Sequence, residues 1–179
     1  MAYWRMQLHP GISVEAVRYT VACLAAKLIG LDFGSEPGPT PPAADVGDLL
    51  SVNPAALPEN QRHYWAFATE MRGGDHVLIF AHNYPFALCR VAGAYTYARG
   101  IDPASGRWFR HFRRVDDVRY YGDHKTDARK WNSITMTGTI APLREHNSKS
   151  YLLIKRWPKV PPNNEMQRTK PAQATELRR

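Results

Sequence analysis

The stretch at residues 71–97 constrains the fold more than any other part of the chain. Its sequence, MRGGDHVLIFAHNYPFALCRVAGAYTY, predicts a helix end, a Gly-Gly stop and two strands joined by a tight polar turn. Apolar residues fill both faces of the first strand, and the second strand carries a single charge, at Arg90. A strand that is apolar on both faces is buried on both faces. We therefore expect this hairpin to be the centre of the fold and its turn, at residues 82–85, to face a ligand.

The size and composition of the chain indicate one domain followed by a tail. With 179 residues, 44% of them hydrophobic, the chain can build a substantial core. We expect residues 1–158 to form this domain. Residues 159–179 have no apolar pattern and carry five basic against two acidic side chains, so we expect a disordered basic tail. The formal net charge of +8 is compatible with a nucleic-acid partner without requiring one.

The cysteines and the lack of long apolar runs bear on location. Cys23 and Cys89 lie within apolar stretches, which is typical of buried thiols in a reducing compartment. No signal-peptide core follows the first residues, and no apolar run reaches the roughly 18 residues that a membrane helix needs. We therefore expect a cytoplasmic protein without a membrane partner.

The sequence before residue 71 predicts two helices and two short strands. Residues 3–8 alternate as a strand, with Trp4, Met6 and Leu8 on one face. Residues 13–28 predict an amphipathic helix. The expected core face of this helix consists of Val17, Val21, Leu24 and Leu28.

A second helix is expected between a long loop and the hairpin. Residues 28–34 predict a short strand, and residues 36–58 predict a loop because they contain six prolines. Residues 61–71 then predict a helix that ends at the Gly-Gly pair. Its expected core face consists of Tyr64, Phe67, Ala68 and Met71, with Trp65 on the flank.

The sequence after the hairpin predicts mainly strands. Residues 107–121, 134–143 and 151–157 each predict a strand, and residues 122–131 predict a polar loop. Because the helices come early and strands dominate later, βαβ alternation is not sustained. The expected fold class is therefore α+β, with a strongly curved mixed sheet or small barrel of about six strands.

Catalytic and metal-binding motifs are missing from the sequence. It contains no phosphate-binding glycine loop, no GxSxG, no HExxH and no CxxC. The seven histidines do not pair at i, i+4 on an expected helix, so we expect no metal site and no cofactor. Adjacent carboxylates at Asp116 and Asp117 point to opposite faces of a strand and do not converge on a metal. An enzyme stays an alternative for which no nucleophile and base can be named.

A basic and aromatic strand is the clearest candidate for binding. Its arginines alternate with aromatic residues, and this combination holds phosphate groups and stacks bases in nucleic-acid-binding proteins. The same pattern also fits an exposed edge strand that charge keeps soluble. The expected backbone-binding residues are Arg107, Arg110, Arg113, Arg114 and Arg119.

Several segments, taken in order, resemble a known family. They are a first strand with Trp-Arg, an Ile-Gly-x-x-Phe-Gly strand at residues 29–34, and a Trp-x-Phe-x-x-Glu-Met helix at residues 65–71. Gly-Asp-x-Val follows at residues 74–77, then Arg-Val-x-Gly-x-Tyr-x-Tyr at residues 90–97 and His-x-Arg-Arg-Val at residues 111–115. The series resembles the PUA-like superfamily in its EVE-like branch, which includes relatives of YTH readers and modules of modification-dependent restriction systems.

The resemblance implies both a fold and a function. The fold is a pseudo-barrel of about six mixed strands flanked by two or more helices. The function is non-catalytic reading of nucleic acid, DNA or RNA, with a base, often a modified one, held in an aromatic-lined pocket that restores its stacking and hydrogen bonds. The alternative is a domain that binds a free nucleotide or another small molecule. The implied pocket residues are Trp4, Arg5, Asp32, Phe33, Trp65, Asn83 and Tyr84.

Overall fold

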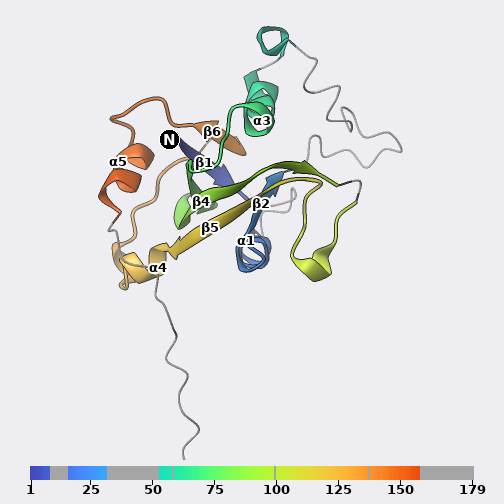
Figure 1. Ribbon diagram of the computed structural model, residues 1–179. Helices are drawn as coiled ribbons and strands as arrows, with labels where there is room; N and C mark the ends of the chain where they lie inside the picture. Colours follow the sequence, from blue (N-terminus) through green and yellow to red (C-terminus); the bar gives the residue numbers. More distant parts are fainter. Residues whose placement is uncertain (9–15, 32–52, 58, 99, 137, 158–179) are drawn as a thin grey trace, which may run out of the picture.

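The fold is built on a curled, mixed sheet in the order β2-β5-β4-β3-β1-β6 (Figure 1). The computed structural model describes residues 1–8, 16–31, 53–57, 59–98, 100–136 and 138–157. β1 and β3 run parallel, and the other neighbouring strands are antiparallel. The strands are β1 (Tyr3–Gln7), β2 (Leu28–Leu31), β3 (His76–Ala81), β4 (Tyr84–Tyr97), β5 (His111–Tyr120) and β6 (Ile140–Pro142). This confirms the expected α+β class with a curved mixed sheet.

Helices cover both faces of this sheet. α1 and α3 contribute to one hydrophobic core, while α4 and α5, on the left of Figure 1, pack against the other face. The α-helices of the described residues are α1 (Ala16–Ala25), α3 (Glu59–Thr69), α4 (Tyr121–His124) and α5 (Lys149–Arg156). Three short 3₁₀ turns in the same part of the chain are η2 (Pro54–Ala56), η3 (Pro103–Ser105) and η4 (Ala128–Lys130).

The β3–β4 hairpin lies between the two cores, as its sequence predicts. Val77 and Ile79 belong to the core with α1 and α3, which we call the inner core. Leu78 and Phe80 belong to the outer core with α4 and α5. All four side chains are at most 1% exposed. The interpretation of residues 77–80 as a strand buried on both faces is therefore confirmed.

The curl of the sheet coincides with irregular pairing between β4 and β5. The register shifts between the Leu88 and Arg90 pairs, where β5 carries an extra residue, and again between the Val91 and Tyr95 pairs. Asp117 lies within the first irregularity, with φ at 46°. Bulges of this kind bend a strand and increase its twist. They allow one long ribbon to wrap around the inner core.

The predicted strand at residues 151–157 is wrong, because this segment is helix α5. Ser148 caps the helix, and its Oγ accepts a hydrogen bond of 3.3 Å from the backbone N–H of Tyr151. Ser150, Ile154 and Trp157 are buried at a spacing of four and three residues, which is the helical period. The apolar run at residues 151–154 resembles a strand locally, but the N-cap and the basic last turn favour a helix.

The expected core face of the first helix is confirmed at Leu24 but wrong at Val17 and Val21, and Leu28 belongs to β2. Val17 and Val21 are 49% and 46% exposed. The buried residues of α1 are Ala16, Tyr19, Thr20, Cys23 and Leu24. Arg18 is the single charged residue of α1, so the apolar period does not define one face.

Three further expectations need correction in extent. Among the described residues of the strand expected at 134–143, only those of β6 form a strand. The loop expected at residues 122–131 contains most of α4 and all of η4. The hairpin turn is shorter than expected, because only His82 and Asn83 form it and Tyr84 already belongs to β4. Of the loop predicted at residues 36–58, the structure describes residues 53–57. The tail predicted at residues 159–179 lies entirely outside the described residues.

Gly30 gives a test of the close approach between β2 and β5. A Cβ at Gly30 would lie 2.6 Å from the His111 carbonyl oxygen and 2.9 Å from the Cβ of Phe109. We expect Gly30→Ala to lower the free energy of unfolding by about 1–3 kcal/mol in urea denaturation, since overpacking forces the strands apart. Gly100→Ala is the control, because its added Cβ meets no atom within 4 Å. Equal stability of the two variants would contradict this packing.

Candidate functional site

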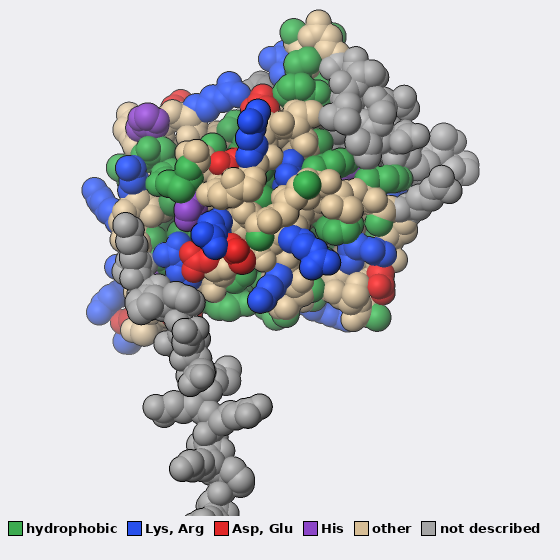
Figure 2. All heavy atoms as spheres, in the orientation of Figure 1, with side chains coloured by type: hydrophobic (Ala, Val, Ile, Leu, Met, Phe, Trp, Pro, Cys, Tyr) green, Lys and Arg blue, Asp and Glu red, His purple; other side chains and the backbone are tan. Residues whose placement is uncertain are grey.

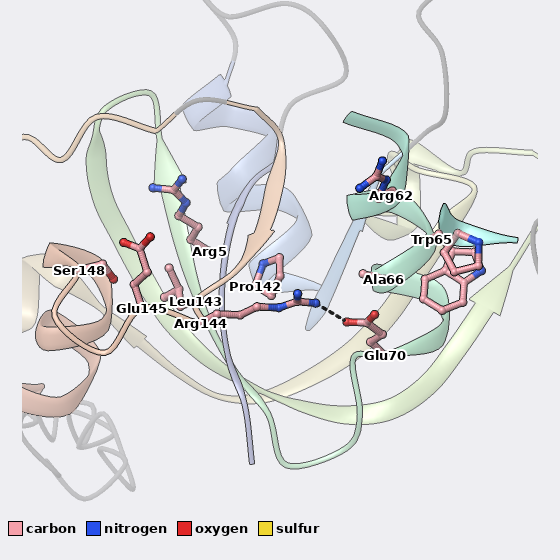
Figure 3. Close-up of a pocket in the computed structure, with 11 residues that line it drawn as sticks. Arg5, Arg62, Trp65, Ala66, Glu70, Pro142, Leu143, Arg144, Glu145 and Ser148 are labelled. Atoms are coloured by element: carbon pink, nitrogen blue, oxygen red, sulfur yellow. Dashed lines mark hydrogen bonds and ion pairs between the residues drawn. The ribbon is translucent and has the colours of Figure 1, made fainter. Parts of the chain in front are cut away.

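A hollow of about 650 Å³ lies at the β6 edge of the sheet and is the candidate site (Figure 3). We call it the β6 hollow. It lies between α3 on one side and the segment that leads into α5 on the other. Its volume is within the range of small-molecule and cofactor sites. The lining residues are Arg5, Pro54, Arg62, Trp65, Ala66, Glu70, Pro142, Leu143, Arg144, Glu145 and Ser148.

Local structure explains how two elements present their side chains to the hollow. Arg62 and Trp65 lie on α3, and the buried face of that helix, Phe67, packs in the inner core. The Nε of Arg62 donates a hydrogen bond of 2.8 Å to the Leu57 carbonyl oxygen, which ties this arginine to the chain before the helix. Arg5 projects from β1 on the face opposite to Trp4, as strand alternation requires.

Two polar N–H groups in this lining have no hydrogen-bond partner among the described residues. They are the Nε of Arg5 and the indole Nε1 of Trp65, and both atoms are buried. A buried donor without a partner costs about 1–3 kcal/mol, so such atoms in a hollow indicate where a water or a ligand binds. Both residues line the hollow, but neither of these two atoms has accessible surface in the structure.

Charge in the hollow is mixed, with basic groups in excess. Arg5, Arg62 and Arg144 face two carboxylates, Glu70 and Glu145. Arg144 donates from Nη2 to the Glu70 carboxylate at 3.4 Å, and this ion pair extends across the hollow (Figure 3). An anionic ligand would gain from the three guanidinium groups and would be repelled by the two carboxylates.

Two of the predicted pocket residues, Arg5 and Trp65, lie in this hollow. Trp4 does not: it is 2% exposed and belongs to the inner core. Its indole N–H donates to Asp75 at 3.1 Å, and Asp75 also accepts hydrogen bonds from the backbone N–H groups of Ala2 and Arg72. The expectation that Trp4 forms a pocket wall is therefore replaced by a core role.

The hairpin turn does not reach the β6 hollow. Asn83 and Tyr84 are exposed and are absent from its lining. The Asn83 carbonyl oxygen accepts a hydrogen bond of 2.8 Å from the Ile134 N–H, which ties the turn to the outer core. Asp32 and Phe33, the remaining two predicted pocket residues, lie outside the described residues.

Arg113 is a structural residue and not a phosphate contact, which corrects the prediction from the basic strand. It is 4% exposed and donates to the carbonyl oxygens of Phe67, Ala68 and Gly93 at 3.0, 2.9 and 3.3 Å. It thereby satisfies carbonyl groups in the last turn of α3, which have no partner within the helix. Burial lowers the pKa of its guanidinium, and Asp75 and Tyr95 oppose this shift.

The other arginines of this strand region do not line the hollow either. Arg107 lies over the Phe112 ring, 5.8 Å from its centroid, and Arg110 is half-buried. Arg119 forms an ion pair of 3.4 Å with Asp117, and its side chain is 16% exposed. Of the five predicted backbone contacts, Arg114 alone is exposed.

The acidic pair of the sequence forms ion pairs on the sheet surface. Arg90, the one charge of the central hairpin, donates two hydrogen bonds to Asp116, of 2.8 and 2.9 Å. These bonds lower the pKa of the Asp116 carboxyl. Figure 2 shows basic side chains over β4 and β5 with acidic side chains among them. The surface over these strands is therefore mixed in charge.

Sequence reasoning missed most of the hollow. Arg62 carried no signal beyond its place on a predicted helix. Glu70 and Arg144 are 74 positions apart, and only the pairing of β6 with β1 brings them together. Ser148 as an N-cap was a signal that the sequence contained, and it would have predicted a helix in place of a strand at residues 149–156.

The described residues offer no metal or thiol chemistry. Within them, no group of three His, Cys, Asp or Glu side chains is placed to hold a metal ion. Both cysteines are free and buried, as expected. Burial raises the pKa of Cys23 to about 12 and shifts that of Cys89 upward as well, so neither thiol ionises readily.

Comparison with known proteins does not assign a family. No protein-family model matches this chain, and no curated protein is significantly similar to it. Among the helices that the structure describes, none is both long and apolar enough to span a bilayer.

Arg113 is buried and donates to backbone carbonyl groups, whereas the adjacent Arg114 is exposed, so the two residues allow a direct test of the capping role. We expect Arg113→Met to lower the free energy of unfolding by about 3 kcal/mol, because it leaves buried carbonyl groups without a donor. Arg114→Met is the control and should change stability by less than about 0.5 kcal/mol, as exposed substitutions do. Chemical denaturation followed by circular dichroism measures both. A stable Arg113→Met variant would contradict the capping role.

Proposed function

We propose that this chain is a non-catalytic nucleic-acid-binding domain that takes a base, modified or unmodified, into the β6 hollow. Trp65 supplies the aromatic face, and Arg5, Arg62 and Arg144 supply cations for phosphate groups. These four residues come from three separate segments of the sequence, which are β1, α3 and the chain after β6, and they line one hollow. Aromatic stacking with arginine contacts is the usual means of holding a single strand or a flipped base.

The observation that carries this proposal is that three guanidinium groups and one indole line the same hollow. A base edge and a phosphate are both rich in acceptor atoms, so nucleic acid suits donors of this kind. The formal net charge of +8 also favours a polyanion over a neutral ligand.

The shape of the hollow favours an extended ligand. In Figure 3, Trp65 and Arg62 lie at one end, while Glu145 and Ser148 lie at the other. A strand with a base at Trp65 and phosphates towards Arg5 and Arg144 would use both ends. A free nucleotide fits the volume as well, and a thermal-shift comparison of nucleotides with oligonucleotides separates these ligands.

We also propose that the curled, mixed sheet belongs to a PUA-like pseudo-barrel of the EVE-like branch. The support is the curled mixed sheet with helices on both faces, together with the ordered sequence segments. A cytoplasmic location is part of the same proposal, and the two free, buried thiols suit a reducing compartment.

Fluorescence anisotropy with labelled oligonucleotides tests the reader proposal. Single strands and duplexes of DNA and RNA, with and without base modifications, are titrated at low salt. We expect Trp65→Ala to weaken binding by about 1–3 kcal/mol, which is the value of one base–aromatic stack. Trp65→Phe keeps an aromatic ring and should lose less. Arg62→Gln should reduce the slope of log affinity against log salt by about 1.

Arg129→Gln is the matched control for charge. It removes the same charge from the η4 turn, where the side chain is 91% exposed and does not line the hollow. The affinity of the Arg129→Gln variant for the oligonucleotide should stay close to that of the unmodified protein. The proposal fails if no oligonucleotide binds, or if the Arg62 and Trp65 variants bind as tightly as this control.

A further inference from the structure

The Arg144–Glu70 ion pair is the one charged contact that the described structure makes across the β6 hollow. Glu70 follows directly after α3, and Arg144 lies two residues after β6. In Figure 3, Arg144 extends from the α5 side of the hollow towards α3 to reach Glu70. The pair therefore lies on the path of any ligand that spans both sides.

This ion pair has the properties of a contact that breaks easily. It is a single N–O contact of 3.4 Å, whereas charge-assisted hydrogen bonds are typically about 2.7–2.9 Å. The side chains are 76% and 40% exposed, and exposed pairs of this kind contribute little to stability. The Arg90–Asp116 pair, with hydrogen bonds of 2.8 and 2.9 Å, is a bidentate contact in the same protein for comparison.

A phosphate group is a better partner for Arg144 than Glu70 is in this geometry. A guanidinium carries five N–H donors, and one of those on Arg144 forms the single bond to Glu70. A phosphodiester accepts two parallel hydrogen bonds from a guanidinium through its two unesterified oxygens and carries one negative charge, as a carboxylate does, whereas a terminal phosphate monoester carries more. Glu70 would then stand beside the phosphate as an unpaired like charge.

We propose that Glu70 is a competing anion that holds Arg144 until a ligand phosphate displaces it. This inference rests on the proposed function, because it assigns the phosphate position within the same hollow. Arg144 is then a specificity-determining residue for phosphate, and Glu70 lowers the affinity of the site. Ligands without a phosphate gain nothing from breaking the pair.

A double-mutant cycle tests this exchange with a labelled single strand of about 12 nucleotides, a length suited to single-strand sites. We expect Glu70→Gln to tighten binding about twofold to fivefold, since it frees Arg144 and removes a like charge. Arg144→Gln should weaken binding several-fold. In the Arg144→Gln background, Glu70→Gln should improve affinity less, because the part of the gain that comes from freeing the arginine is lost.

Glu145→Gln is the matched control, since it removes the same charge from the same hollow, and within the described part of the chain the structure shows no ion pair of the Glu145 carboxylate. It should improve affinity less than Glu70→Gln does. In competition assays, Glu70→Gln should increase the affinity of the protein for a nucleoside monophosphate. It should leave the affinity for the nucleoside without phosphate unchanged. The Glu70 and Arg144 variants should keep the melting temperature of the unmodified protein within a few degrees, because both side chains are exposed.

The outcomes separate this inference from the reader proposal. If the oligonucleotide binds but Glu70→Gln improves affinity equally in both backgrounds, Glu70 acts as a general repulsive charge and the exchange is wrong. An equal gain from Glu145→Gln would contradict the exchange in the same way. If neither oligonucleotide nor nucleotide binds any of these proteins, the reader proposal fails, and the inference fails with it.

Discussion

The rest of the structure depends on the burial of strand β3 on both faces. Val77 and Ile79 need the inner core, whereas Leu78 and Phe80 need the outer core. Full burial of such a side chain contributes about 1.5–3 kcal/mol. Loss of either helix layer would therefore expose half of the strand. The sheet is therefore the middle layer between the inner and outer cores, and both cores end at the edges of the sheet.

The β6 hollow follows from that arrangement. The helix on one side of it, α3, packs in the inner core, and α5 on the other side packs in the outer core. The edge strand between them has only three residues and ends at Pro142, which cannot donate to a further strand. Neither core extends around such a short edge. Polar side chains from both helix layers therefore meet at this edge without filling it.

Local sequence determined the centre of the fold but not the site. The hairpin, the face of β1 with Trp4, and the buried face of α3 were predictable, because each depends on alternation or helical period within one segment. The face of α1 was not, since Val17 and Val21 are as apolar as the residues that are buried. Arg5 and Trp65 were predicted as pocket residues through the resemblance. To predict that Arg144 lines the same hollow, one would have needed the register of β6 on β1.

The arginines show why residue type alone does not identify an anion site. Arg113 donates three hydrogen bonds, all to backbone carbonyl oxygens. Arg90 donates two hydrogen bonds from Nε and Nη2 to the Asp116 carboxylate. The Arg113 guanidinium is buried and unavailable while the protein is folded, whereas the Arg90 side chain is 49% exposed and its ion pair can open in the folded state. Arg5 and Arg144 have incomplete bonding among the described residues, and both line the hollow. Under the proposed function, the availability of donors, and not the density of charge along the sequence, separates the arginines proposed to bind from the structural ones.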